Sequence, residues 1–248
     1  MRPALAVLLG ALGGALLSVA VYAVLRHAPR DRDAEKKGSR FLLGVGDFLV
    51  HWLMWALGPL ERTMLRLGMT PDHMNAAGLV LGALSGLLIG LGHLELGGWA
   101  IVLSGVCDIL DGRLARTRGV ASAYGKFIDS TLDRFVESFA FLGFVAYYRH
   151  QPAGAFVAAA ALAASLLVSY AQARGETVNV SGSGGLMQRA ERLVLTAAGC
   201  LLDPVLSAAL GRPEGTVLLW VLCLIAAGAF FTAIHRTIWI ARRLRGGA

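Results

Sequence analysis

Four aspartates stand close together in a chain that is otherwise strongly apolar. The stretch DILDGRLARTRGVASAYGKFIDSTLD, residues 108–133, contains them between segments built from Leu, Ala, Val and Gly. Asp108 and Asp111 are three residues apart and Asp129 and Asp133 are four apart, so each pair shares one face of a helix. Because ionisable groups are costly in hydrocarbon, such residues in a membrane segment indicate a functional site.

The connecting turn TRGVAS is short enough to make the two helices antiparallel neighbours, so the four carboxylates are expected to converge on one cavity. Unpaired carboxylates repel one another, and Mg²⁺ relieves this, since it binds one or two carboxylates together with substrate phosphates. A pair of ions would stabilise both the attacking and the leaving oxygens of a phosphoryl transfer. Gly112 and Gly125 leave room for a ligand, and Arg116 is placed to meet phosphate oxygens.

Two other interpretations of the aspartates remain open from the residues themselves. The carboxylates would form internal salt bridges in the first, with Arg113, Arg116, Lys126 and Arg134 as partners. In the second they would line a proton or cation pathway, because transporters also hold buried aspartates. Four carboxylates at helical spacing with glycines between them favour a metal-dependent enzyme over either alternative.

The composition excludes an ordinary soluble domain. Of the 248 residues 56% are hydrophobic and only 16% are charged, whereas about a quarter is usual. The formal charge of +7 is not arranged as a basic stripe with interleaved aromatics, so a nucleic-acid partner is not expected. Basic cytoplasmic loops of an integral membrane protein explain the excess. The three cysteines lie in apolar runs without CxxC spacing, which predicts neither a disulfide framework nor a zinc site.

Hydropathy predicts an all-α, polytopic membrane helix bundle, because a spanning helix needs about 20 mostly apolar residues. Residues 3–25 are predicted to be an uncleaved transmembrane anchor, with a cleaved signal peptide as the alternative. Residues 41–67 mix Trp and Phe with charges, which favours an interfacial amphipathic helix over a buried or spanning one. Six core transmembrane helices are expected near 74–93, 97–117, 122–148, 153–174, 190–209 and 215–240.

The distribution of Lys and Arg predicts the orientation of the spans. With the N-terminus outside, three of the 23 basic residues, Arg2, Arg149 and Arg212, fall on the outer side, and the other twenty lie at or near the cytoplasmic side. This asymmetry places the aspartate stretch at the cytoplasmic face of the cell membrane.

One predicted span carries glycines at every fourth position, namely Gly78, Gly82, Gly86 and Gly90. A smooth helix face of this kind lets another helix approach closely. The stripe is interpreted as packing inside the bundle, with dimer formation as the alternative.

The aspartate stretch resembles the signature of the CDP-alcohol phosphotransferase (CDP-alcohol phosphatidyltransferase) family. The match consists of D-x-x-D-G-x-x-A-R, eight residues, then G-x-x-x-D-x-x-x-D, beginning at Asp108 and ending at Asp133. The wider resemblance begins at GMTPDHMNAAG, where the family often has Thr-Pro-Asn and this chain has Asp72 as the third residue. The resemblance covers roughly residues 68–245 and implies a catalytic domain at 68–248. The anchor with its charged linker at 1–40 and the interfacial helix at 41–67, both predicted from hydropathy and composition, lie outside or at the edge of it.

The resemblance also implies roles for individual residues. Two Mg²⁺ or Mn²⁺ ions would be held by Asp108, Asp111, Asp129 and Asp133, and Asp133 would also be the catalytic base. The CDP site would be formed by Asp108, Asp111, Gly112, Ala115, Arg116 and Gly125. The implied reaction transfers a phosphatidyl group from CDP-diacylglycerol to an alcohol and releases CMP, and the implied assembly is a homodimer.

The segments DSTLDR and SYAQARGETVNVSGSGGLMQRAERL resemble the branch containing phosphatidylinositol-phosphate synthases, whose acceptor is inositol phosphate. The implied acceptor pocket consists of Arg174, Arg192, Arg189 and Arg236. Gln172 stands where that branch usually has lysine, and Ala190 where it has proline. The resemblance makes a polyol phosphate such as inositol 1-phosphate the expected acceptor, and the two departures leave glycerol 3-phosphate or an uncharged alcohol as alternatives. Ordinary positive-inside bias is another explanation for these arginines.

Overall fold

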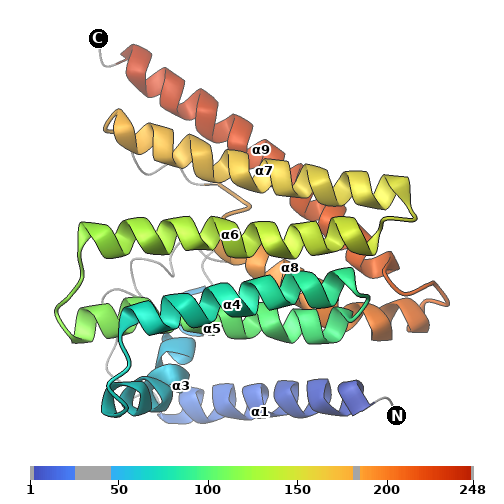
Figure 1. Cartoon of the computed structure of the whole chain (residues 1–248), viewed down its shortest axis with the longest axis horizontal. Coiled ribbons are helices and arrows are strands. Elements are labelled where there is room, and N and C mark those ends of the chain that lie inside the picture. The colour runs from blue at the N-terminus through green and yellow to red at the C-terminus, as the bar shows by residue number, and fades with distance from the viewer. Residues whose placement is uncertain (1–2, 26–45, 181–184, 247–248) are drawn as a thin grey trace. The chain divides into compact units, whose positions relative to one another are not determined.

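The computed structural model describes residues 3–25, 46–180 and 185–246, and within these ranges every regular element is a helix (Figure 1). The helices are α1 (Pro3–Leu25), α3 (Gly46–Arg66), α4 (Pro71–Gly90), α5 (Leu94–Thr117), α6 (Ala123–Tyr147), α7 (Pro152–Thr177), α8 (Arg189–Ala209) and α9 (Thr216–Gly246). They form two compact units, Met1–Met74 with Ile109–Ala121, and Asn75–Asp108 with Ser122–Ala248. The prediction of an all-α, polytopic membrane protein is confirmed.

Four helices of the described residues are long and apolar enough to cross a membrane: α4, α7, α8 and α9. Helices α5 and α6 coincide with two further predicted spans, but they carry the charged residues of the aspartate stretch, which lower their hydropathy. In α1 the described apolar segment is the shorter Gly13–Val24. The predicted linker between α1 and α3 lies outside the described residues.

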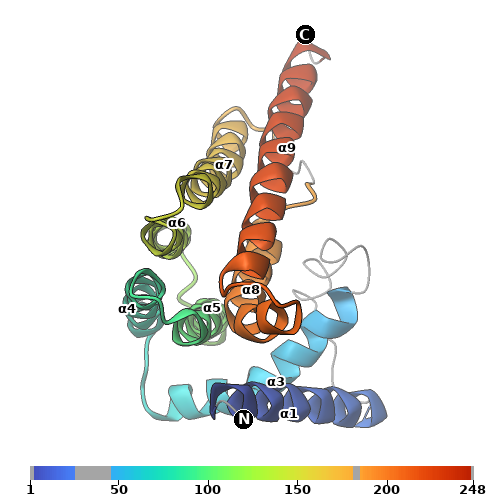
Figure 2. The same cartoon turned by 90° about the vertical axis from the view of Figure 1, so that its right-hand side faces the viewer.

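The second unit is a bundle whose helices contact one another around a ring (Figure 2). In order around the ring they are α4, α5, α8, α9, α7 and α6, and α6 meets α4 again. The interior is filled by a cluster that includes Ile89, Phe141, Phe144, Leu218 and Leu222, each at most 1% exposed. The same cluster includes Leu94 and Ile101 of α5, so its burial joins the segment of α5 before Asp108 to the second half of α6.

The glycine stripe of α4 packs inside this bundle. A Cβ atom on Gly86 would lie 2.2 Å from the Phe139 carbonyl oxygen of α6, and one on Gly82 would lie 2.7 Å from the Val136 side chain. On the α6 side, a Cβ on Gly143 would lie 2.4 Å from the Gly86 carbonyl oxygen. The backbones of α4 and α6 therefore approach so closely that only glycine fits where they cross.

In the first unit, α3 contacts both α1 and the last turns of α5. The Trp52 indole N–H donates a hydrogen bond to the Ser18 hydroxyl at 3.1 Å, which joins α3 to α1. Arg113 on α5 pairs with Glu61 on α3, and Thr117 donates to the same carboxylate at 2.9 Å. Helix α3 is thus tied to the residues that directly follow the first aspartate pair.

Candidate active site

Local signals end α5 and begin α6 beside the aspartates. Gly119 adopts a φ of +67°, and the N–H of Val120 donates to the Ala115 carbonyl at 3.0 Å, which is the hydrogen-bond pattern of a glycine-terminated helix. Ser122 caps α6, because its hydroxyl accepts a hydrogen bond from the Gly125 N–H at 3.1 Å. These signals place Gly125 in the first turn of α6 and Asp129 one turn further along.

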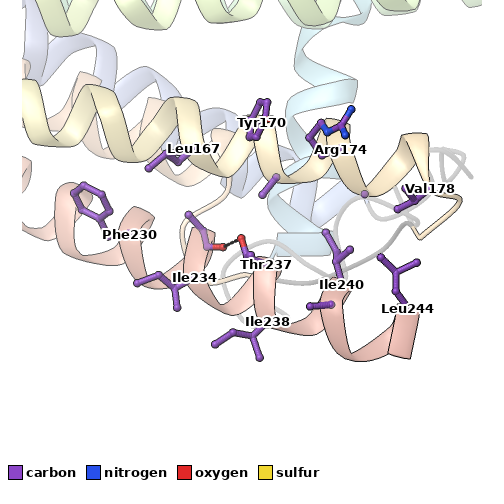
Figure 3. A pocket seen from close by; sticks show the side chains of 14 residues that line it. Leu167, Tyr170, Arg174, Val178, Phe230, Ile234, Thr237, Ile238, Ile240 and Leu244 are labelled. Carbon is purple, nitrogen blue, oxygen red and sulfur yellow. Dashed lines mark hydrogen bonds between the residues drawn. The ribbon is translucent and has the colours of Figure 1, made fainter. Parts of the chain in front are cut away.

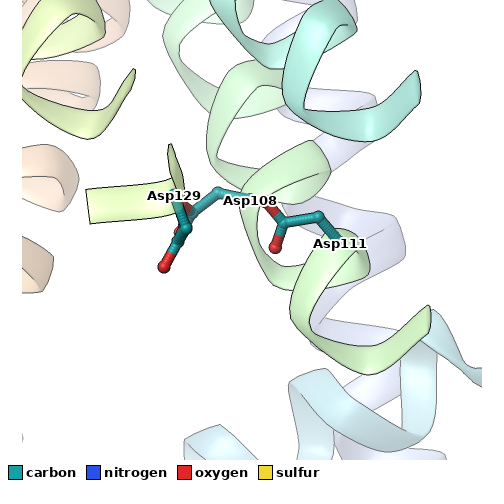
Figure 4. Close-up of side chains that lie close together, drawn as sticks. All are labelled: Asp108, Asp111 and Asp129. Carbon is teal, nitrogen blue, oxygen red and sulfur yellow. The ribbon is translucent and has the colours of Figure 1, made fainter. Parts of the chain in front are cut away.

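Three of the predicted metal ligands lie together. One carboxylate oxygen from each of Asp108, Asp111 and Asp129 can be chosen so that all three lie within 4.8 Å of one another. Asp108 and Asp111 share a face of α5, and Asp129 is supplied by α6 (Figure 4). Asp111 is buried, at 5% exposure, while Asp108 and Asp129 are half-buried. Three carboxylates at this separation form a set of hard oxygen donors that suits Mg²⁺ or Mn²⁺.

The fourth aspartate is connected to this group through an arginine. Arg189, the first residue of α8, contacts Asp108 with an Nη1–Oδ2 distance of 3.0 Å, and its other terminal nitrogen pairs with Asp133. A second, longer ion pair joins Arg134 Nη1 to Asp133 Oδ2 at 3.7 Å. Asp133 therefore pairs with the guanidinium groups of both Arg189 and Arg134, and its side chain is only 13% exposed.

Glu137 is a charged residue of this region that the sequence analysis did not single out. Its carboxylate accepts two hydrogen bonds from Arg192, at 2.6 Å from Nε and 3.0 Å from Nη2. Arg192 also donates to the Met187 carbonyl at 3.1 Å, and its side chain is 1% exposed. Asp133, Glu137, Arg189 and Arg192 line one small cavity of about 30 Å³. The spacing of the acidic residues could have identified Glu137 from the sequence, because it continues the four-residue repeat of Asp129 and Asp133.

The small residues predicted to line the CDP site have space beside them. Among the described residues, a Cβ on Gly112 would approach only the Arg116 guanidinium, at 3.4 Å, and one on Gly125 would approach only the Ser122 hydroxyl, at 3.6 Å. Ala115 is half-buried and Arg116 is exposed. The two glycines are therefore not required by helix packing, in contrast to Gly86, and this leaves access for a ligand.

The arginines predicted for an acceptor differ in their surroundings. Arg236 of α9 is 3% exposed and donates to the Val168 carbonyl and to the Gln172 side chain, both at 3.0 Å. Gln172 in turn donates to Glu176 at 3.2 Å. Arg174 is exposed and lines a different cavity, a largely apolar one of about 620 Å³ between α7 and α9 (Figure 3). The structure therefore groups Arg189 with the aspartates and Arg174 with this apolar groove.

The salt-bridge alternative describes only part of what the structure shows. Arg134 does pair with Asp133, but Arg113 is directed to Glu61 of α3. Arg189, which comes from α8 and was not among the partners expected for the aspartates, bridges Asp108 and Asp133.

Comparisons with known proteins agree on one family. The model of the CDP-alcohol phosphatidyltransferase family matches residues 68–228. A phosphatidylinositol phosphate synthase of Corynebacterium glutamicum is 35% identical over 191 residues, which cover 73% of this chain and 81% of that protein. Among solved structures, the Mycobacterium tuberculosis phosphatidylinositol phosphate synthase with CDP-DAG bound has a TM-score of 0.64 and 28% identity over 73% of this chain and 92% of that one. The same enzyme in complex with manganese and citrate has a TM-score of 0.64 and 29% identity, over 73% of this chain and 88% of that one.

The chain therefore belongs to the CDP-alcohol phosphatidyltransferase family. It is an integral membrane transferase, which confirms the prediction of an enzyme over that of a transporter. The matched segment contains all four aspartates and Arg192, and it ends before Arg236.

Proposed function

We propose that this enzyme transfers a phosphatidyl group from CDP-diacylglycerol to a polyol phosphate, with inositol 1-phosphate as the expected acceptor, and releases CMP. The observation that carries this proposal is the gathering of Asp108, Asp111 and Asp129 within 4.8 Å inside the segment that matches the family. The similar enzymes are phosphatidylinositol phosphate synthases, and one of them was solved with CDP-DAG bound. This reaction would give the enzyme a role in phospholipid synthesis.

Asp108, Asp111, Asp129 and Asp133 would hold two divalent ions, Mg²⁺ or Mn²⁺, and the manganese complex of the similar enzyme supports this assignment. The ions, when bound, neutralise charge that develops on the diphosphate. Gly112, Ala115, Arg116 and Gly125 would surround the CDP moiety beside Asp108 and Asp111. The open space at both glycines supports this part of the proposal.

Asp133 would act as the general base of the reaction. The acceptor hydroxyl oxygen attacks the phosphorus on the lipid side of the diphosphate, and the bond from that phosphorus to the CMP oxygen breaks. The hydroxyl proton passes to Asp133, and CMP leaves with the electron pair of the broken bond. The half-buried place of Asp133 beside the cavity lined by Arg189 and Arg192 supports this role.

Arg192, Arg189, Arg236 and Arg174 would contribute to binding of the acceptor phosphate, because guanidinium groups bind phosphate oxygens in pairs. Arg192 and Arg236 have the stronger support, since both are buried and directed by fixed hydrogen-bond partners. Gln172 accepts a hydrogen bond from Arg236, so it would help to orient this cation although its own side chain is uncharged.

The experiment measures CMP release by the purified full chain with Mg²⁺ or Mn²⁺ and CDP-diacylglycerol. The acceptors are inositol 1-phosphate, glycerol 3-phosphate, inositol and serine, each tested separately. We expect release with inositol 1-phosphate, and we expect Asp133→Asn to reduce it roughly 10²-fold or more through loss of the base. The mutant should still bind CDP-diacylglycerol, seen as thermal stabilisation.

Asp72→Asn is the matched control, because it makes the same chemical change on an exposed residue at the start of α4. It should retain activity. Release with glycerol 3-phosphate alone would assign a different acceptor, and absence of release with every acceptor together with absence of CDP-diacylglycerol binding would contradict the proposed reaction.

We further propose that the N-terminus lies outside, that the site opens to the cytoplasm, and that two chains form a homodimer. The distribution of basic residues supports the orientation. Residues 1–40, 41–67 and 68–248 would be the anchor with its linker, the interfacial helix and the catalytic domain. The family match beginning at residue 68 supports the last boundary.

A further inference from the structure

Arg189 is a basic residue of the second unit that bridges α5 and α6 by pairing with a carboxylate on each helix. Its Nη1 atom lies 3.0 Å from Oδ2 of Asp108 on α5. Its Nη2 atom pairs with Oδ1 of Asp133 on α6. The side chain starts at the first residue of α8, so one guanidinium joins three helices of the bundle.

The oxygens that Arg189 contacts belong to residues that the proposed function assigns to the metal ions. A guanidinium and a divalent cation satisfy the same need, since each offsets the repulsion of neighbouring carboxylates. An oxygen whose lone pairs are directed at an N–H group is less available to a metal, and the positive charge of Arg189 also repels a cation brought close to it. The Arg189 guanidinium and a bound divalent cation therefore compete for the carboxylates of Asp108 and Asp133.

The Arg189 side chain has space to move away from the aspartates when a metal ion binds. Its side chain is 30% exposed, whereas the neighbouring Arg192 is 1% exposed and fixed by three hydrogen bonds to Glu137 and Met187. Arg192 already has a carboxylate partner outside the aspartate group, so it does not compete for the aspartates. Arg189 has both of its ion pairs within that group.

We propose that Arg189 is an internal counter-ion that competes with the divalent cation for Asp108 and Asp133, and thereby sets the metal affinity of the enzyme. The proposal rests on the proposed function in taking these aspartates as metal ligands. It makes Arg189 a positioning residue, which acts through Asp108 and Asp133 and sets the metal concentration at which the enzyme becomes active.

The experiment measures Mn²⁺ binding to the purified full chain in detergent by electron paramagnetic resonance, without nucleotide. Arg189→Gln removes the competing charge, so it should bind Mn²⁺ more tightly, by roughly tenfold, the scale of one charge-assisted hydrogen-bonded pair. Arg189→Lys keeps the charge but cannot bridge both carboxylates in the same way, and an intermediate affinity is expected. Arg118→Gln removes one charge from the exposed turn after α5 and should leave the affinity unchanged.

Thermal unfolding provides a second measurement that a purely structural role of Arg189 would not reproduce. In EDTA, Arg189→Gln should unfold at a lower temperature than wild type, because the carboxylates are left without their counter-ion. Saturating Mn²⁺ should remove this difference. A residue that only supports packing would lower the unfolding temperature equally with and without the metal.

Unchanged or weaker Mn²⁺ binding by Arg189→Gln would overturn the proposal. If the wild-type enzyme still releases CMP in that case, the proposed function stands and only the competition is wrong. If Asp108→Asn does not weaken Mn²⁺ binding and CMP release is also absent, the metal assignment falls together with the inference.

Discussion

At the scale of single residues, Arg189 and Arg192 belong to two separate sets of ion pairs. Arg189 pairs with Asp108 and Asp133, whereas Arg192 pairs with Glu137. The second set is the more deeply buried one, and its three hydrogen bonds leave the guanidinium in a single orientation. Glu137 therefore decides where the Arg192 side chain points beside the cavity that Asp133 also lines.

Replacement of Glu137 should be costly. Glu137→Gln leaves the Arg192 charge buried without its carboxylate, and we expect a loss of about 3–5 kcal/mol of stability, the range known for breaking one side of a buried pair. The measurement is thermal unfolding of the purified protein in detergent. Glu176→Gln is the control, because Glu176 is exposed and its bond to Gln172 survives the change, so its unfolding temperature should stay close to wild type. Equal unfolding temperatures for both variants would show that Glu137 does not stabilise Arg192.

At the scale of helices, glycine determines which elements cross closely. The α4–α6 crossing has no space for a side chain at Gly86, because a Cβ there would meet the Phe139 carbonyl oxygen. Since α6 also carries Asp129 and Asp133, this crossing helps to place the second aspartate pair relative to the rest of the second unit. The stripe is thus a structural requirement of the site, although it contributes no chemical group to it.

Gly86→Ala should separate α4 from α6 and lower the unfolding temperature, with a cost of about 1–3 kcal/mol or more for overpacking. Gly13→Ala in α1 is the matched control, because its Cβ meets nothing within 4 Å. The control should be neutral or slightly stabilising, as expected when alanine replaces glycine in a helix. Both variants are compared by thermal unfolding and by the yield of monodisperse protein. A Gly86→Ala protein as stable as wild type would show that α4 and α6 can shift without loss.

The helix-scale predictions were accurate where periodicity and length were sufficient. The six core helices coincide with the predicted spans to within a few residues at most ends, although α9 continues to Gly246. Hydropathy was weaker for α5 and α6, because the charged residues of the aspartate stretch interrupt their apolar runs. Placement of the interfacial helix at the membrane surface stays a prediction, and α3 is not among the described helices that are apolar enough to span.

At the scale of the whole molecule, charge asymmetry predicts the orientation in the membrane. Accessibility to a membrane-impermeant maleimide in intact cells is the measurement, in a background where Cys107, Cys200 and Cys223 are replaced by alanine. His150→Cys, in the turn after α6, should be labelled from outside. Arg118→Cys, in the turn after α5, should be labelled only after the membrane is permeabilised. The opposite pattern would reverse the proposed orientation and place the aspartates on the outer side.

The sequence by itself determined the class of protein, the order of the helices and the aspartate pattern. These follow from local rules, because a helix in hydrocarbon needs about 20 apolar residues and helical spacing brings residues three or four apart onto one face. The side chain of Asp129 lies with those of Asp108 and Asp111, and the family match covers this whole stretch.

Only the tertiary structure decided which charges pair with which. Arg189 meets Asp108 across 81 residues of sequence, Arg192 meets Glu137 across 55, and Arg113 meets Glu61 across 52. Each of these pairs depends on which helix faces which neighbour, and periodicity within one helix contains no information about that choice. The packing of the helices within each unit makes that choice, and it thereby assigns these guanidinium groups their carboxylate partners.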